Sequence, residues 1–179
     1  MSALQSLQSL QWGSVLDQHF DTAALAAAAR AQSAFPLRRA GRLTEMMVVG
    51  VAACLANQPA CPTLVLAGSC IGARVISHQV ITEIIIAREA PFPYDFLATQ
   101  PILAAVPLRQ NFPCLTNVLY QPWSDDVELH WQQMRTLARV WLQAGRCERV
   151  ICGQVETAGR TGEDEHHGRW QTLERIVGG

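Results

Sequence analysis

The sequence contains no lysine: all 14 of its basic residues are arginines. This absence excludes a phosphate-binding-loop lysine, a Schiff-base lysine and a Ser–Lys catalytic dyad. Charged residues of both signs are also scarce, at 16% of the 179 residues, where soluble domains usually carry about 25%. The net charge of −1 argues against nucleic-acid binding. A chain so poor in charge is expected to cover part of its apolar surface with a partner.

The six cysteines form no C-x-x-C pair and stand in apolar or strand-like surroundings. They are expected to be small buried hydrophobic residues of a protein in a reducing compartment. The first basic residue is Arg30, so the N-terminal stretch lacks the basic region of a secretory signal peptide. Apolar runs such as residues 46–56 are too short to cross a bilayer. The sequence therefore predicts a cytoplasmic protein with no membrane span, no metal and no cofactor.

The length of the chain predicts a single domain over residues 1–179. Strands are predicted at residues 63–67, 115–120 and 149–152, with a short edge strand near residues 10–12. Helices are predicted at residues 23–34 (capped by Asp21 or Thr22), 45–56 (capped by Thr44), 74–87 and 97–106, and from Asp125 or Asp126 to Gln143. Residues 160–169 are expected to be mobile, in a polar tail that runs to residue 179. Strands that alternate with helices indicate a layered α/β fold.

Residues 68–72 read G-S-C-I-G between a predicted strand and a predicted helix. This is the outline of a nucleophile elbow with Cys70 as the nucleophile. Its base would be His78, His166 or His167, oriented by Asp164. The favoured interpretation is a turn that the glycines permit, in which Cys70 packs inward. A small cysteine-dependent (thio)esterase of the α/β-hydrolase type is kept as the alternative function.

Two further polar clusters are interpreted as structural. Residues 163–167 read E-D-E-H-H, and adjacent histidines point to different sides of any regular element. They are therefore poor joint ligands for one metal, and a solvated acidic turn is expected. The aspartates at 125 and 126 are expected to cap the last helix and pair with its dipole, and Glu128 and His130 after them are also interpreted as structural.

Three segments, taken in order, resemble β-ketoacyl-ACP synthases. Residues 37–44, L-R-R-A-G-R-L-T, are similar to the arginine-rich entry near the start of that family. Residues 64–72 look like the first core strand with its glycine-rich end. Residues 141–156, W-L-Q-A-G-R-C-E-R-V-I-C-G-Q-V-E, are similar to the segment after the nucleophile helix. Order and intervals agree over residues 37–157.

The sequence departs from this family at the nucleophile, a cysteine at the mouth of the last helix. Counting forward from Pro113 places Gln121 at that position, and counting back from Gly145 places Glu128, seven residues later. The nearest cysteine, Cys114, precedes the predicted strand. A carboxamide or a carboxylate cannot be acylated by a thioester as a thiolate can. The resemblance therefore implies no catalytic residue in this chain.

A second departure is that the resemblance covers only one half of the family's fold. Ketosynthases have a thiolase-like fold of two similar α/β halves, and the second half supplies two active-site histidines. The resemblance implies an α/β fold, the N-terminal half of a thiolase-like fold with a mixed sheet, and no second half. It further implies a chain length factor, a non-catalytic subunit that heterodimerises with a full-length β-ketoacyl-ACP synthase and shapes its acyl tunnel. Half-length versions resemble those of aryl-polyene pathways, in polyketide or fatty-acid-like biosynthesis.

The resemblance also implies which segments would meet the partner. The strand that would pair antiparallel with its counterpart in the partner comprises Leu115, Thr116, Asn117, Val118, Leu119 and Tyr120. The residues expected beside the tunnel are Phe96, Gln100, Leu103 and Trp123. The alternative is that these segments are ordinary core of a lone α/β domain. Arg38, Arg39 and Arg42 are interpreted first as a solvated loop and second as a contact for the acidic acyl carrier protein.

Overall fold

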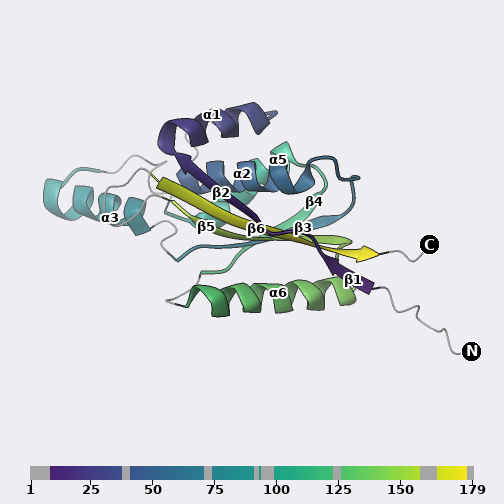
Figure 1. The fold of residues 1–179 in the computed structure, drawn as a ribbon. Helices are drawn as coiled ribbons and strands as arrows, with labels where there is room; N and C mark the ends of the chain where they lie inside the picture. The colour runs from purple at the N-terminus through teal and green to yellow at the C-terminus, as the bar shows by residue number, and fades with distance from the viewer. Residues whose placement is uncertain are drawn as a thin grey trace, which may run out of the picture.

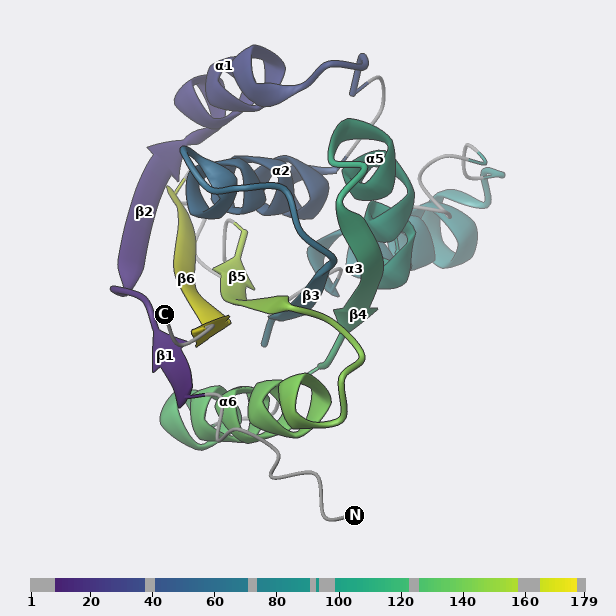
Figure 2. The same cartoon turned by 90° about the vertical axis from the view of Figure 1, so that its right-hand side faces the viewer.

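A computed structural model describes residues 9–37, 41–70, 74–90, 93, 99–122, 126–157 and 165–176 of the chain. In this part of the chain a six-stranded sheet lies between two layers of helices (Figure 1). One face is covered by α1 (Thr22–Gln32), α2 (Arg42–Leu55) and α5 (Ala105–Asn111), and the other by α6 (Val127–Gln143) (Figure 2). No helix within these ranges is long and apolar enough to cross a membrane.

The sheet is mixed. Its strands are β1 (Ser9–Trp12), β2 (Leu16–Asp21), β3 (Thr63–Gly68), β4 (Leu115–Tyr120), β5 (Arg149–Glu156) and β6 (Glu165–Ile176). The order across the sheet is β1-β6-β5-β3-β4, and β2 also pairs with β6. β3 runs parallel to both β4 and β5, whereas β6 is antiparallel to β5, β1 and β2. The predicted layered α/β fold with a mixed sheet is confirmed.

The central strands bury both of their faces, which explains their continuous apolar sequences. In β3, Val65 and Ala67 pack into the core beneath α1, α2 and α5, while Leu64 and Leu66 pack against α6. β5 alternates in the same way, and it continues to Glu156 rather than ending at Cys152 as the sequence predicted.

Strand β6 corrects the prediction of a mobile polar segment at residues 160–169. Residues 165–169 form the first part of this strand, which lies inside the sheet between β5 and the two N-terminal strands; residues 158–164 and 177–179 lie outside the described part. Buried and outward-facing residues alternate along this segment, as they do in a strand: His166 and Gly168 are buried, whereas Glu165, His167 and Arg169 face outward. The alternation was missed because the buried positions are not occupied by apolar side chains. The partner strand β2 was not predicted either.

Aspartate side chains cap two of the helices. Asp21 caps α1 by accepting the Ala24 amide at 2.7 Å, and Asp126 caps α6 by accepting the Leu129 amide at 2.8 Å. The predicted cap at Thr44 is wrong, because α2 begins earlier, after Gly41, and Thr44 is buried in its first turn.

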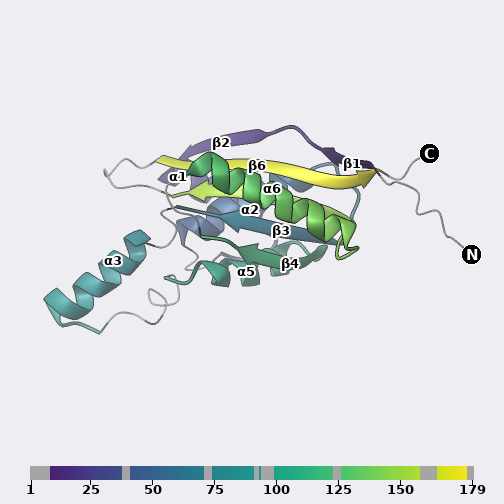
Figure 3. The ribbon, with the colours of Figure 1, turned by 90° about the horizontal axis from the view of Figure 1, so that it is seen from below.

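The described part of the segment between β3 and β4 is mostly helical. α3 (Arg74–Thr82) continues into the π-helix η1 (Glu83–Ala87) and projects away from the sheet (Figure 3). The helix predicted at residues 97–106 is a 3-10 turn, η2 (Pro101–Ala104), followed by α5, which extends to Asn111. Residues 97 and 98 lie outside the described part.

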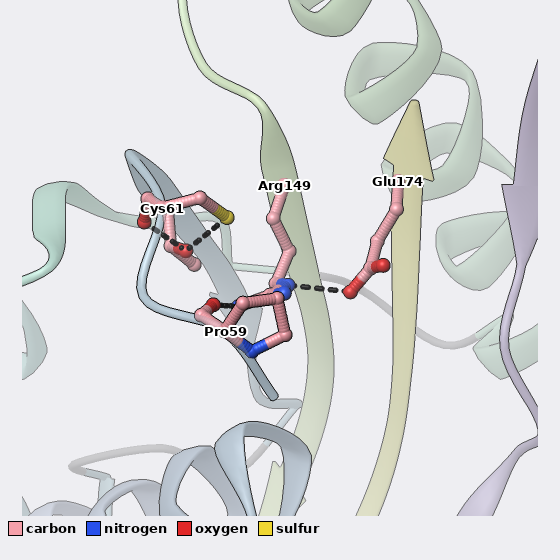
Figure 4. A network of polar contacts seen from close by, with 5 residues as sticks. Pro59, Cys61, Arg149 and Glu174 are labelled. Atoms are coloured by element: carbon pink, nitrogen blue, oxygen red, sulfur yellow. Dashed lines mark hydrogen bonds and ion pairs between the residues drawn. The ribbon is translucent and has the colours of Figure 1, made fainter. Parts of the chain in front are cut away.

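One buried arginine joins the start of β5 to its neighbours (Figure 4). Arg149 is 2% exposed, and its Nε donates to Glu174 Oε1 on β6 at 2.5 Å. Its Nη1 donates to the Pro59 carbonyl at 3.1 Å, in the loop before β3. The guanidinium therefore fixes the amino-terminal end of the parallel strands, opposite the end where the candidate site lies.

Candidate functional site

The carboxyl ends of the three parallel strands meet at one edge of the sheet. β3 ends at Gly68, β4 at Tyr120 and β5 at Glu156, with Gly68 opposite Gln154 and Ala67 opposite Tyr120 in the pairing register. In open α/β sheets, ligands bind at this end of the strands. α6 also begins here, because Gln154 Nε2 donates to the Val127 carbonyl at 2.8 Å. We call this group of residues the carboxyl-edge cluster.

A carboxylate holds the turn that leaves β3. Glu156 accepts the Cys70 amide at 2.5 Å through one oxygen and the Ser69 hydroxyl at 3.1 Å through the other. Tyr120 donates its hydroxyl to the Ser69 carbonyl at 3.3 Å. The turn is thus fixed from both neighbouring strands, and the carboxylate of Glu156 binds backbone and hydroxyl groups rather than the Cys70 thiol.

A second contact joins β3, β4 and α6. A Cβ on Gly68 would overlap the ring of His130 and would come within 2.5 Å of the Gln121 carbonyl oxygen, so this close approach requires glycine. Burial lowers the pKa of His130 from its ordinary 6.5, and the nearby Gln121 backbone partly offsets that effect. The Gln121 amide donates to the Ala67 carbonyl at 2.8 Å.

The two candidate nucleophile-equivalent positions differ sharply in their surroundings. Gln121 follows β4 directly and belongs to the carboxyl-edge cluster through its backbone. Glu128 is exposed on the first turn of α6, where its carboxylate lies 3.3 Å from Arg169 Nη1, whose guanidinium in turn covers the ring of Trp131. The structure therefore brings Gln121 to the site and leaves Glu128 outside it. Which of the two corresponds to the ketosynthase cysteine stays a prediction.

The histidines considered as a base for Cys70 have other surroundings. His166 is buried and bonds to Thr22 Oγ1 at 3.0 Å, and His167 lies 3.7 Å from Asp17, on the opposite face of β6. His78 is exposed on α3. Among the described residues no hydrogen bond joins any of these histidines to Cys70, and Asp164 lies outside them. The geometry does not favour the thioesterase alternative.

Three other cysteines are protected by burial. Burial raises the pKa of Cys54 and of Cys152 to about 12, and the charges of Arg149 and Arg135 respectively act in the opposite direction. Burial also raises the pKa of Cys147. These thiols stay protonated at neutral pH and are not nucleophiles. Within the described ranges, no three His, Cys, Asp or Glu side chains come together as metal ligands.

The strand predicted to meet a partner lies at an edge of the sheet. Among the described strands, β4 pairs with β3 alone, and the exposed Thr116 marks an irregularity in that pairing. Leu115 and Val118 are buried, Asn117 is exposed, and Leu119 and Tyr120 are half-buried. Of the residues predicted beside the tunnel, Gln100 is exposed just before η2 and Leu103 is exposed within it; Phe96 and Trp123 lie outside the described part.

Sequence reasoning missed the parts of the cluster that depend on the sheet. His130 was interpreted as an ordinary structural residue of the last helix and Glu156 as the end of a family motif. One signal could have identified both residues as part of the site: each lies at the carboxyl end of the parallel strands, where polar groups from separate segments converge.

The fold is similar to that of solved ketosynthase complexes. The chain matches a structure of the ketosynthase ApeO in complex with its chain length factor ApeC from Xenorhabdus doucetiae with a TM-score of 0.64 and 14% identity; the match covers 94% of this chain and 80% of the other. It matches the ishigamide ketosynthase/chain length factor with a TM-score of 0.58 and 13% identity. This second match covers 93% of the present chain and 63% of the matched chain, which is less than two thirds of the length of the matched chain. No protein-family model and no curated sequence matches the chain. The predicted ketosynthase-like α/β fold is confirmed, and this chain has the fold found in complexes of ketosynthases with chain length factors.

Proposed function

We propose that this chain is a non-catalytic, chain-length-factor-like subunit that heterodimerises with an active β-ketoacyl-ACP synthase and shapes its acyl tunnel. The observation that carries the proposal is the residue at the corner after β4. The chain has the fold of ketosynthase complexes, and it places Gln121 where β3, β4 and α6 meet. An amide side chain cannot form the thioester on which a ketosynthase depends.

The edge of the sheet supports the proposed mode of association. β4 pairs with one strand only among the described elements, so its other edge could accept a strand of another chain, which would have to replace the bond of the Val118 amide to Asn117 Oδ1 at 2.9 Å if that amide lies on this edge. An antiparallel strand of the ketosynthase would continue the sheet from one subunit into the next.

Exposed apolar side chains on the same side of the sheet also support a partner. α3 with η1 and α5 lie on the β4 side of the molecule (Figure 2, Figure 3). Their large exposed hydrophobic residues are Ile81, Ile84, Ile85 and Ile86 on α3 and η1, and Ile102, Leu103 and Val106 on η2 and α5. Ile85 and Ile86 are 69% and 76% exposed. A concentration of this kind is typical of a protein interaction surface.

The substrate class follows from the proposed partner. A ketosynthase extends acyl chains carried on an acyl carrier protein, so the complex would act in polyketide, aryl-polyene or fatty-acid-like biosynthesis in the cytoplasm. The acyl carrier protein would dock on the complex, and the arginines at positions 38, 39 and 42 would be its cationic contact. The present chain would contribute walls of the tunnel rather than reacting groups.

Co-expression with a full-length β-ketoacyl-ACP synthase tests this proposal. Size exclusion with light scattering is expected to show a one-to-one complex, and elongation of acyl-carrier-bound substrate is expected only when both chains are present. Replacing the nucleophilic cysteine of the ketosynthase should abolish elongation and leave the complex intact. A stable monomer of this chain that never joins any ketosynthase offered to it would refute the proposal.

A further inference from the structure

The outward side of α6 carries little charge for a helix that faces solvent. α6 is the outer layer on its side of the sheet, and no other described element lies over it (Figure 1, Figure 3). A surface helix ordinarily places charged residues opposite its buried stripe. On α6 the exposed residues opposite that stripe are all uncharged: Leu129, Gln132, Gln133, Thr136, Val140 and Gln143. Because Leu129 and Val140 are 52% and 51% exposed, this side of the helix has the character of a contact surface.

Two arginines border this surface in the second half of α6. Arg135 and Arg139 lie over the ring of Trp12 on β1, with their Cζ atoms 4.6 Å and 5.9 Å from its centroid. The Nε of Arg135 is buried and has no hydrogen-bond partner among the described residues. The two guanidinium groups are therefore held in place by an aromatic ring rather than by a carboxylate.

Two further arginines extend the positive charge past the end of α6. Arg146 is exposed just after the helix, and Nη2 of Arg175 on β6 would lie 3.9 Å from a Cβ on the neighbouring Gly145. In the part of the chain that the structure describes, none of the four arginines forms an ion pair. The exposed Glu148 adjoins them, since its carbonyl accepts the Arg175 amide at 3.4 Å, so the group keeps a net positive charge. We call this group the arginine end of the α6 face: Arg135, Arg139, Arg146 and Arg175.

The opposite end of the same face is acidic. Glu128 lies on the first turn of α6, 3.3 Å from Arg169 of β6. Beyond it, Asp17, Asp21 and Glu165 occupy positions of β2 and β6 that alternate with the residues packed beneath α1 and α2, so they lie on the α6 side. With one arginine among these four carboxylates, the acidic end (Asp17, Asp21, Glu128 and Glu165) has a net negative charge.

We propose that two copies of this chain associate through their α6 faces, with the two α6 helices antiparallel across a twofold axis. A twofold contact uses the same surface twice, so a face that is basic at one end and acidic at the other is complementary to itself. The antiparallel arrangement brings each arginine end to the acidic end of the other copy, whereas a parallel one would bring like charges together. When Leu129 of one copy lies near Val140 of the other, Arg139 comes beside the other copy's Glu128.

This contact leaves the other edge of the sheet free. β1, whose Trp12 carries the two stacked arginines, and β4 lie at opposite edges of the sheet. Self-association through α6 and a ketosynthase at β4 therefore use separate surfaces, and the first does not depend on the function proposed above. If both contacts form, the one-to-one complex would occur as an assembly of two copies of each chain.

Sedimentation equilibrium of this chain alone tests the contact. The wild type is expected to dimerise, and to do so about tenfold less tightly when the salt concentration rises from about 0.1 M to about 1 M, because exposed ion pairs are screened. Val140→Glu should weaken the dimer at least about tenfold, because a carboxylate would be desolvated at an apolar contact. Ile86→Glu is the control: Ile86 is 76% exposed on η1, away from α6, and its replacement should leave the dimer unchanged.

Two charge reversals test the antiparallel arrangement. Arg139→Glu and Glu128→Arg should each weaken the dimer at least about tenfold, because each places like charges opposite one another in both halves of the contact. An equimolar mixture of the two variants should recover the dimer, since an arginine then meets a glutamate in both halves. Both side chains are exposed, so circular dichroism should show both variants folded.

Each arm of the experiment can overturn the proposal. A wild-type chain that stays monomeric at about 0.1 mM has no such contact. A dimer that Val140→Glu and both charge reversals leave intact uses another surface, and a mixture of the reversed variants that stays monomeric excludes the antiparallel arrangement. Binding of the ketosynthase is measured separately, so the failure of the α6 contact and the failure of the proposed function are distinguishable.

Discussion

Trp170 of β6 lies directly against Gly50 of α2, so closely that a Cβ on Gly50 would overlap the indole ring. Gly153 of β5 and Gly168 of β6 leave room for the same ring, and a Cβ on Gly153 would overlap it as well. Trp170 is fully buried and anchors α2 on the sheet. Its position explains why three glycines occur inside regular elements.

Gly50→Ala is expected to destabilise the protein by about 2 kcal/mol or more, because the added methyl group must displace a buried ring. Helix propensity alone predicts the opposite sign, a gain of roughly 1 kcal/mol for alanine over glycine. Chemical unfolding followed by circular dichroism measures the difference. Ala27→Gly, on the exposed side of α1, is the control and should cost about 1 kcal/mol. A stabilised Gly50→Ala protein would contradict the packing described.

Glu174→Ala is expected to lower the free energy of unfolding by about 2–3 kcal/mol, because it leaves the buried guanidinium of Arg149 without its carboxylate. This value lies at or just below the lower end of the roughly 3–5 kcal/mol that breaking a fully buried pair costs, since Glu174 is itself one third exposed. The double variant Arg149→Met with Glu174→Leu should recover most of that loss. If urea unfolding shows that the single and double variants are equally stable, then leaving the guanidinium of Arg149 without a carboxylate has no energetic cost of its own.

The sequence predicted those elements whose pattern is local. The continuous apolar runs of β3 and β5 and the capped amphipathic helix α6 all appear where they were expected, because burial of both strand faces and an Asp cap leave direct signals. β6 was missed because its residues are polar, and its identity as a strand depends on pairing with β5, β1 and β2, which lie far away in the chain.

The candidate site was predictable only in part, for the same reason. Gln121 was identified from its interval to Pro113, whereas its neighbours at the site, the ring of His130 and the backbone of Gly68, come from other elements. Neither a histidine in a helix nor a glycine at the end of a strand has a sequence pattern that marks it as part of a site. Only the convergence of strand ends at one edge of the sheet brings them together.

The stability of the protein is expected to fall on acidification through His130. Burial lowers the pKa of this residue below 6.5 in the folded state. Below about pH 6.5 the unfolded chain therefore binds a proton that the folded chain does not, so the free energy of unfolding falls with pH, by at most about 1.4 kcal/mol per unit. Above pH 6.5 this contribution is constant.

Urea unfolding of the wild type and of His130→Gln at pH 8 and pH 5 isolates this effect, because the other four histidines are common to both proteins. The wild type should lose more stability than the variant between the two values. A variant with the same pH dependence as the wild type would show that His130 does not titrate below its ordinary range.

Ile85→Glu and Ile86→Glu are expected to weaken the complex with the ketosynthase by at least about tenfold each, because a carboxylate would be desolvated at an apolar contact. Both side chains are more than two thirds exposed in this chain, so its own folding should tolerate the change.

Val140→Glu is the matched control. Val140 is half-exposed on α6, which covers the opposite face of the sheet from α5, and its replacement should alter neither folding nor association with the ketosynthase. Affinities come from titration calorimetry. Equal weakening by all three substitutions would point to a general effect of charge, and no weakening by any of them would remove α3 and η1 from the proposed contact.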